Sequence, residues 1–178
     1  MKKRTLDLSQ VYKLIEPGPV VLVSTIKGKK PNIMTMSWHM MVDFEPPKIA
    51  CVISNRDYTF GTLKSSKECV INIPTVELAP KVVACGNTSG RTVDKFQKSG
   101  LTESAASMVR APLINECYAN LECKVIDTKM ISKYNIFILE VVQAWISSSK
   151  KVRRTIHHQG LGKFVVDGKV IKLPSKMK

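Results

Sequence analysis

The stretch ANLECKVIDTKMISKYNIFILEVVQAWI, residues 119–146, decides the fold of this chain. It contains two long runs, Ala119–Ile131 and Asn135–Ile146, in which apolar and polar residues alternate. Alternation with a period of two is typical of strands that bury one face, and β-branched and aromatic side chains favour the same geometry. The polar break Ser132-Lys133-Tyr134 separates the two runs. The second half of the chain is therefore expected to be β-structure.

Shorter strands are expected on the N-terminal side of this stretch. They are Val20–Ile26, Asn32–Trp38, Ile49–Ser54 and Cys69–Ile73. Turn residues bound these runs: Pro17-Gly18-Pro19 precedes the first, Lys27–Lys30 predicts a hairpin turn after it, and Pro46-Pro47 precedes the third.

Helical spacing occurs in two short segments. Thr59–Ser66 predicts one or two helical turns, with Asp57 at the N-cap position. Val76–Ala84 predicts a second helix that ends at Gly86, a natural C-cap. The polar segment from residue 87 to residue 100 is expected to be mostly loop.

The C-terminal region carries a hairpin signal. Lys163–Val166 and Lys169–Ile171 flank Asp167-Gly168, a dipeptide typical of type I′ turns. Many short strands, two small helices and no strict β–α alternation favour a barrel over a doubly wound sheet. Closing the sheet would also remove the exposed edges of these apolar strands. With no repeat and no linker, residues 1–178 are expected to form one domain of the mainly β class with a few short helices.

The charge of the chain favours anionic partners. The 178 residues include 28 Lys and Arg against 14 Asp and Glu, a formal net charge of +14. The basic residues are spread out, with local clusters at Lys27–Lys30, Lys150–Arg154 and Lys172–Lys178. No apolar run approaches the ~20 residues that cross a bilayer, and no apolar segment follows the basic N-terminus. A cytoplasmic protein with no membrane partner is expected.

The cysteine pattern favours free thiols. The five cysteines are Cys51, Cys69, Cys85, Cys117 and Cys123. Their number is odd and no Cys-x-x-Cys is present, which argues against a secreted disulfide framework. The spacing of Cys117 and Cys123 matches no common zinc module and no His is near, so no metal site is expected.

Several catalytic motifs are absent. No Gly-x-Gly-x-x-Gly follows an expected strand, and no Gly-x-Ser-x-Gly is present. Gly86–Arg91 is not a P-loop, since three residues rather than four separate its glycines and Arg replaces Lys. His39, His157 and His158 have no recognisable Asp or Cys partner. The catalytic residues are therefore unknown at this point.

Two polar segments lie beside expected strands. In Asn32–Trp38, small hydroxyl and amide side chains alternate with large apolar ones, which suits a strand edge against which a flat heterocycle lies. In Ser54–Thr59, hydroxyl and guanidinium groups stand at the end of a strand where a helix begins. These donors and the positive end of a helix dipole favour a phosphate site.

These features resemble the flavin reductase-like family, the FMN-binding split barrels that include the flavoredoxins. The resemblance runs from Pro17 to the C-terminal hairpin. Its pieces are Asn32–Trp38, Ser54-x-Arg56-x-x-Thr59, Cys69-Val70-Ile71-Asn72-Ile73-Pro74, and Ser89-Gly90-Arg91 followed by Asp94-Lys95-Phe96. The resemblance implies an FMN-binding split β-barrel of Greek-key topology.

The resemblance also implies roles for individual residues. Ser54, Arg56 and Thr59 would hold the FMN phosphate, together with Lys95 and Ser89; an arginine fork matches phosphate geometry well. The residues that would line the isoalloxazine ring or the ribityl chain are Asn32, Thr35, Met36, Ser37 and Trp38. As alternatives, Trp38 is equally typical of a core or interface aromatic, and Met36 of a core filler.

Two further positions follow from the family pattern. Phe164 would cover the flavin ring, from the same subunit or from a partner, since the family barrels are typically homodimers. Tyr134 stands near the place where many relatives carry a histidine, and it would replace that histidine sterically in the cofactor-binding site. A tyrosine does not titrate near neutral pH as histidine does, so this position does not support nicotinamide use or proton delivery.

The function that the resemblance implies is an FMN-dependent oxidoreductase, of flavin reductase or flavoredoxin type. It would take electrons from NAD(P)H or an iron–sulfur carrier and pass them through FMN, and the positive charge suits an acidic carrier such as a ferredoxin. One alternative is a non-catalytic flavin-binding module. Another is a basic barrel for single-stranded nucleic acid, which the dispersed aromatic residues, 6% of the chain, do not favour.

Overall fold

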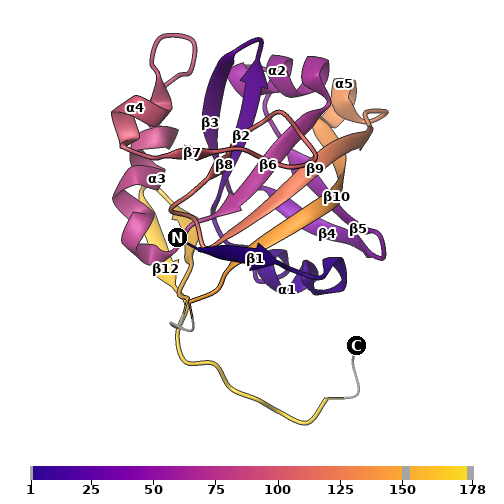
Figure 1. Ribbon diagram of the computed structural model, residues 1–178, viewed down its shortest axis with the longest axis vertical. Coiled ribbons are helices and arrows are strands. Elements are labelled where there is room, and N and C mark those ends of the chain that lie inside the picture. Colours follow the sequence, from indigo (N-terminus) through magenta and orange to yellow (C-terminus); the bar gives the residue numbers. More distant parts are fainter. Residues whose placement is uncertain (1, 150–152, 176–178) are drawn as a thin grey trace.

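The computed structural model describes residues 2–149 and 153–175 and is built around one curled antiparallel sheet (Figure 1). Its strands are β1 (Lys3–Thr5), β2 (Val21–Lys27), β3 (Lys30–Met36), β4 (His39–Phe44), β5 (Pro47–Val52), β6 (Glu68–Ile73), β9 (Ala119–Asp127) and β10 (Ile136–Ser147). Their order is β3-β2-β6-β9-β10-β5-β4, with β1 on β10. The expected mainly β fold is confirmed. Parts of the basic clusters at 150–154 and 172–178 lie outside the described residues.

The two long strands of the second half, β9 and β10, are confirmed. β10 pairs with β9 along one edge and with β5 and β1 along the other. Register shifts at Ile138/Leu139 and Val141/Gln143 mark bulges, which bend a strand and increase its twist. β10 can therefore belong to both halves of the curled sheet. The first run is shorter than expected: β9 ends at Asp127, and the polar break forms the one-turn helix α5 (Ile131–Tyr134).

The inner face of the sheet encloses the main core. Side chains from five strands meet there with almost no exposed surface, among them Val23, Ile71, Leu121, Phe137 and Ile49. Burial of such side chains stabilises a fold by about 1.5–3 kcal/mol each. Burial of these inward-facing side chains therefore explains the apolar positions of the alternating runs in the sequence.

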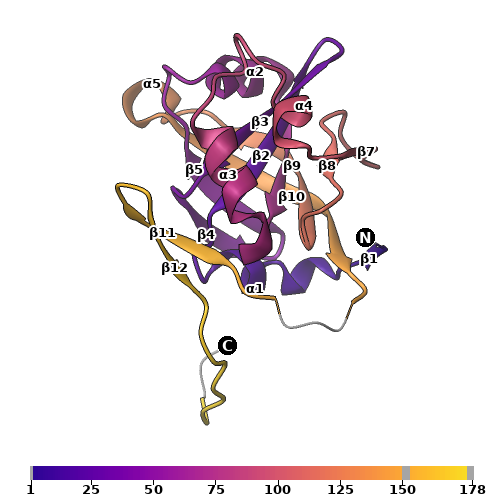
Figure 2. The same cartoon turned by 90° about the vertical axis from the view of Figure 1, so that its left-hand side faces the viewer.

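Helices cover one side and the ends of the sheet (Figure 2). They are the 3₁₀ helices η1 (Leu8–Gln10) and η2 (Val76–Leu78), and α1 (Tyr12–Ile15), α2 (Tyr58–Ser66), α3 (Ala79–Gly86) and α4 (Lys95–Ser99). Both helical segments expected from the sequence are present. Asp57 is the N-cap of α2 but makes no side-chain cap bond, whereas Asp94 caps α4 by accepting from the Gln97 N–H. α3 and α4 pack on β3, and Val82 and Phe96 bury a second core with Leu22 and Ile33.

The C-terminal hairpin differs from the expectation. β11 (Ile156–Gly160) pairs with β12 (Lys163–Val166), and the turn lies at Gly160–Gly162, where all three residues have positive φ. Asp167 is not a turn residue: its carboxylate accepts hydrogen bonds from the Thr155 N–H and hydroxyl, so it ties the end of β12 to the start of β11. Its Oδ1 also lies 2.5 Å from His157 Nε2, so the expectation that His157 has no Asp partner was wrong. Residues 167–175 form no strand and extend away from the body (Figure 1).

Two smaller features complete the fold. β7 (Glu103–Ser104) and β8 (Leu113–Ile114) form a separate short pair.

β4 was not expected from the sequence, because most of its residues are exposed and no alternation marks it. β3 and β4 stand at the two ends of the strand order, so the barrel is split between them. Within residues 2–149 and 153–175, no helix is both long and apolar enough to cross a membrane.

Candidate functional site

Two adjoining cavities lie where the barrel is split. The first, called the inner cavity, has a volume of ≈ 340 Å³. It is lined by Asn32, Met34, Thr35, Arg56, Asp57, Tyr58, Thr59, Cys85, Gly86, Thr88, Ser89, Gly90 and Lys95. The second, called the ring cavity, has a volume of ≈ 460 Å³ and is lined by Met34, Thr35, Met36, Ser37, Trp38, Val52, Ser54, Asp57 and Asn135. Together they form one cleft, because they share Met34, Thr35 and Asp57.

The inner cavity gathers cations and hydroxyl groups from three separate segments. Arg56 comes from the turn before α2, Ser89 from the loop after α3, and Lys95 from the first turn of α4. Lys95 is buried, its ammonium donates to the Cys85 carbonyl oxygen at 2.8 Å, and burial lowers its pKa. Among the described residues Lys95 forms no ion pair, although the Asp57 carboxylate lines the same cavity. A buried ammonium of this kind favours an anion beside it. The inner cavity is therefore suited to a phosphate group.

Asn32 gives the inner cavity an unsatisfied acceptor. Its side chain is 4% exposed, its Nδ2 donates to Thr59 Oγ1 at 3.0 Å, and its Oδ1 has no hydrogen-bond partner. Buried polar atoms without a partner are uncommon, and ligand binding is one explanation for them. An O–H or N–H donor on a ligand would satisfy this oxygen. The donor set and this acceptor therefore fit the phosphate and the hydroxyl-bearing chain of FMN.

Gly90 packs directly against the side chain of Asn32. A Cβ atom on Gly90 would overlap Asn32 Oδ1 and would lie 2.7 Å from its Cγ and 3.0 Å from Cδ1 of Tyr58. Only a residue without a side chain allows the loop to approach this closely. The loop after α3 is thereby held against β3 and α2.

The ring cavity has a flatter and more apolar lining. The link between β3 and β4 contributes Ser37 and Trp38, Val52 is the last residue of β5, and Ser54 follows that strand. Thr35 donates its hydroxyl to the Val82 carbonyl oxygen at 2.7 Å, which fixes β3 to α3. Ser54 accepts from the Arg56 N–H at 3.2 Å and so shapes the turn that carries Arg56.

Ten of the twelve site residues expected from the family resemblance line this cleft. They are Asn32, Thr35, Met36, Ser37, Trp38, Ser54, Arg56, Thr59, Ser89 and Lys95. The other two do not line it. Tyr134 is 51% exposed, with the Lys133 ammonium 5.2 Å from its ring centroid, and Phe164 packs on the second core and on His158. The flavin roles of these two residues stay predictions.

Sequence reasoning missed several lining residues. Asn135 is the clearest case: it has φ 58 after α5, and its carbonyl oxygen accepts from the Ile53 N–H at 3.1 Å. An Asn next to a short polar break is a known candidate for the left-handed region, which was the available signal. Four further residues line the inner cavity because the fold brings separate loops together: Asp57, Tyr58, Thr88 and Gly90. Their positions along the chain do not reveal this.

No group of residues in the described ranges is arranged to hold a metal ion. The five cysteines are free and buried. Burial raises the pKa values of Cys51, Cys85 and Cys117, which keeps these thiols protonated.

Comparisons with known proteins relate most of the chain to a protein family. The flavin reductase like domain matches residues 14–161. The uncharacterized protein YddH of Escherichia coli (strain K12) is 31% identical over 179 aligned positions, covering 92% of this chain and 94% of YddH. An FMN-binding domain of a flavin reductases-like enzyme from Shewanella baltica OS155 has a TM-score of 0.90 at 26% identity, covering 97% of this chain and 98% of that chain. Flavoredoxin of Desulfovibrio vulgaris (Miyazaki F) has a TM-score of 0.80 at 23% identity, covering 89% of this chain and 91% of that chain.

The fold is thus the split barrel of FMN-binding proteins. The chain belongs to the flavin reductase-like domain family, since the match spans most of its length.

Proposed function

We propose that this protein binds FMN non-covalently in the cleft and acts as a flavin-dependent oxidoreductase. The observation that carries the proposal is the inner cavity, which is lined by Arg56, by buried Lys95 and by Asn32, whose buried Oδ1 has no hydrogen-bond partner. When bound, FMN supplies the chemistry of hydride and single-electron transfer. The protein binds and orients FMN and excludes water from one face of the flavin.

Each part of the cleft has a separate task in this proposal. Arg56, Lys95 and Ser89 hold the phosphate, helped by the N-terminus of α2, whose first residues Tyr58 and Thr59 line the inner cavity. Asn32 accepts from a ribityl hydroxyl. Apolar side chains of the ring cavity exclude water from one face of the flavin.

The electron source is part of the proposal. Electrons arrive from NAD(P)H or from an acidic iron–sulfur carrier such as a ferredoxin, and the net charge of +14 supports the second route through electrostatic steering. The five reduced, buried thiols suit the proposed cytoplasmic location.

The direct test is the visible spectrum of the purified protein, with FMN titration if the preparation is colourless. Anaerobic bleaching with NADH, NADPH or reduced ferredoxin then identifies the donor. Bound FMN that no donor reduces would favour the non-catalytic flavin-binding module. Failure to bind FMN at high excess would overturn the proposal, and binding of single-stranded oligonucleotides would then favour the nucleic-acid alternative.

Replacing Arg56 with alanine should weaken FMN binding by about 2 kcal/mol, or about 30-fold in Kd, because a charge-assisted hydrogen bond to phosphate is lost. The measurement is quenching of flavin fluorescence on titration. Lys64→Ala is the matched control, since Lys64 is an exposed cation on α2 that lines neither cavity. An unchanged Kd for Arg56→Ala would remove this residue from the site.

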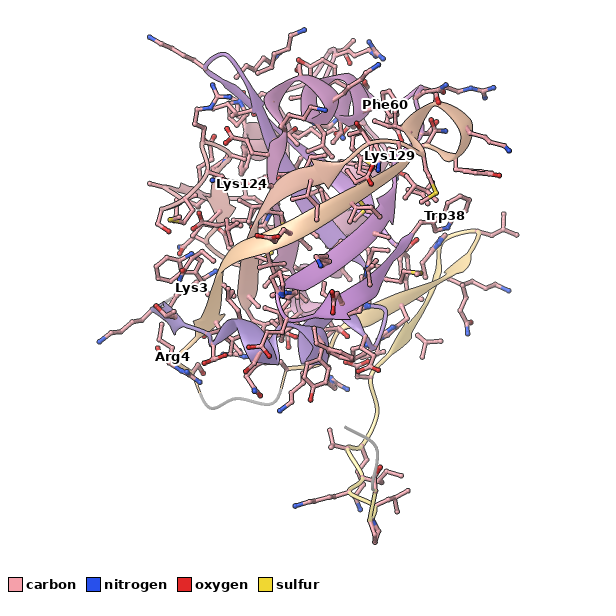
Figure 3. All side chains as sticks on the ribbon, turned by 90° about the vertical axis from the view of Figure 1, so that its right-hand side faces the viewer. Lys3, Arg4, Trp38, Phe60, Lys124 and Lys129 are labelled. Carbon is pink, nitrogen blue, oxygen red and sulfur yellow. The ribbon has the colours of Figure 1, made fainter. Side chains whose placement is uncertain are left out.

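A homodimer belongs to the same proposal. The outer face of β4, β5 and β10 forms an apolar groove of ≈ 390 Å³, and Trp38 and Met40, which line it, are 71% and 62% exposed. Trp38 lies at the outer edge of the molecule in Figure 3. Exposed apolar patches of this kind mark interaction surfaces. Trp38 and Val52 line both the groove and the ring cavity, so a second copy would close that side of the flavin site.

Placing a charge in this groove should prevent dimer formation. Val42→Glu is expected to shift the protein from dimer to monomer in sedimentation velocity at micromolar concentration, because an unpaired carboxylate would be buried in an apolar interface. Leu173→Glu is the control, since Leu173 is exposed in the C-terminal extension. A wild-type protein that sediments as a monomer would contradict the dimer proposal.

A further inference from the structure

One end of the barrel carries exposed lysines on three separate connections. Because neighbouring strands are antiparallel, the β2–β3 turn, the β5–β6 connection with α2 and the β9–β10 connection with α5 all lie at this end (Figure 1). We call this surface the basic end. Its lysines, all exposed, are those of Lys27–Lys30, Lys64, Lys67, Lys129 and Lys133.

Few carboxylates offset this charge. In the described part of the chain, none of the lysines of the basic end forms an ion pair. Asp57 lines the cleft, Glu68 pairs with Arg110 at 2.7 Å, and Asp127 accepts a hydrogen bond from the Lys129 backbone N–H at 2.6 Å. The basic end is therefore suited to an anionic partner.

The opposite end of the barrel has mixed charge. It is formed by β1, η1, α1 and the β4–β5 turn (Figure 1). Its exposed charged residues include Asp7, Glu16, Asp43 and Glu45 as well as Arg4 and Lys13. Positive charge is thus concentrated at one end of the barrel, and such an uneven field orients a charged partner as it approaches.

The lysines of the β2–β3 turn are placed at a cost to the fold. Lys27 and Lys30 lie directly opposite each other in the strand register, and Lys29 is exposed between them. Like charges directly opposite each other destabilise a pair of antiparallel strands. No carboxylate in the described part of the chain forms an ion pair with these three lysines. This arrangement favours a partner that brings negative charge from outside.

The basic end adjoins the cleft on two sides. Asp57 and Tyr58, on the β5–β6 connection, line the inner cavity. Asn135, which follows α5 on the β9–β10 connection, lines the ring cavity two residues after Lys133. Tyr134 between them is 51% exposed, and the Lys133 ammonium lies 5.2 Å from its ring centroid. A protein that docks at the basic end therefore reaches the side of the molecule where the flavin site lies.

We propose that the basic end is the docking surface for an acidic iron–sulfur carrier protein, which supplies electrons to the flavin. This inference rests on the proposed function, because the carrier must meet a bound flavin. At each encounter the cluster of the carrier is oxidised by one electron. Two encounters, with uptake of one proton from solvent, reduce the flavin fully. The lysines of the basic end steer the carrier and orient it beside the cleft.

The test measures the rate at which a reduced acidic ferredoxin bleaches the FMN-loaded protein in stopped flow. For the wild type, the second-order rate constant should fall about tenfold between about 20 and about 300 mM NaCl, because salt screens the charges of both proteins. Two double variants remove charge from the basic end: Lys29→Glu, Lys30→Glu and Lys129→Glu, Lys133→Glu. Each should react about tenfold more slowly than the wild type at low salt and almost equally fast at high salt.

The chain offers a control with the same change in net charge. Lys13 in α1 and Lys169 in the C-terminal extension are exposed and lie outside the basic end, so Lys13→Glu, Lys169→Glu should slow the reaction less than about threefold. A neutral deazaflavin radical should reduce the flavin equally fast in all variants. The Kd for FMN should stay unchanged, since the substituted lysines line neither the inner cavity nor the ring cavity.

Several results would overturn the inference. One is a wild-type rate constant that does not depend on salt, and another is a pair of basic-end variants that react as fast as the control. Ferredoxin that leaves bound FMN oxidised would also overturn it, and reduction by NADH or NADPH would then preserve the proposed function. Basic-end variants that lose binding of a single-stranded oligonucleotide but keep the wild-type rate with ferredoxin would assign the surface to nucleic acid instead. Failure to bind FMN would overturn the proposed function itself.

Discussion

Gly90→Ala is expected to weaken FMN binding at least tenfold and to lower the free energy of unfolding by about 2 kcal/mol, within the range for overpacking. The added Cβ would overlap Asn32 Oδ1 and come within 3.0 Å of the Tyr58 ring. Asn32 cannot turn away without losing its bond to Thr59 Oγ1 at 3.0 Å. The loop after α3 must therefore move outward, and Ser89 moves with it.

Two companion variants separate the effect of the collision from a general effect of removing a glycine. Gly61 lies in α2, and a Cβ there meets nothing within 4 Å, so Gly61→Ala should raise the free energy of unfolding by about 0.5–1 kcal/mol. The double variant Asn32→Ala, Gly90→Ala removes the obstructing amide and should recover most of the lost stability. It should not recover FMN affinity, since the Asn32 acceptor is missing. A single Gly90→Ala variant with wild-type affinity would show that the loop does not need this close approach.

Strand alternation predicted the parts of the fold that bury one face. β2, β5, β6, β9 and β10 all lie where alternating or apolar runs stand in the sequence. β4 could not be predicted in this way, because its side chains are mostly exposed and no burial pattern marks them. The C-terminal turn was misplaced because the Asp167 carboxylate is held by Thr155, twelve residues earlier in the chain. Local turn chemistry gave no sign of that contact.

The cleft was predictable where one segment carries several polar groups. Ser54, Arg56 and Thr59 lie within six residues at the end of a strand where a helix begins, and these donors favour a phosphate site. The unsatisfied Oδ1 of Asn32 and the role of Gly90 depend on a contact between β3 and a loop almost sixty residues later, and only the fold brings them together. The same is true of the cavity-lining residues that come from separate loops: the sequence does not show that they lie together.

Glu122 is a second residue whose importance the sequence conceals. In the alternating run of β9 it occupies a polar position and resembles a solvent-facing side chain. In the structure it is fully buried, because residues 104–113 cross over that face of the sheet and cover Val70 and Val142. Its carboxylate accepts from the N–H groups of Ser107 and Met108, at 3.0 and 2.6 Å, and from Trp145 Nε1 at 2.8 Å.

Glu122→Ala should lower the free energy of unfolding by about 3 kcal/mol. The substitution leaves the two N–H groups and the indole N–H without an acceptor, and buried donors without a partner cost about 1–3 kcal/mol each before the chain relaxes. It also releases the segment that covers the outer face of β6 and β10. The measurement is chemical denaturation at neutral pH, with Glu16→Ala, an exposed glutamate, as the control that should change stability by less than about 0.5 kcal/mol.

The dependence of this loss on pH identifies its cause. Burial alone would raise the pKa of Glu122, but hydrogen bonds from Ser107, Trp145 and Met108 outweigh burial, and the pKa is lowered. A carboxylate with a lowered pKa adds stability above its unfolded value of about 4.3 and loses that contribution as the pH falls through the folded value. The difference in stability between the wild type and Glu122→Gln should therefore be largest at neutral pH and shrink in acid. A difference that stays constant from pH 7 to pH 3 would show that packing, rather than the charge on Glu122, holds residues 104–113 in place.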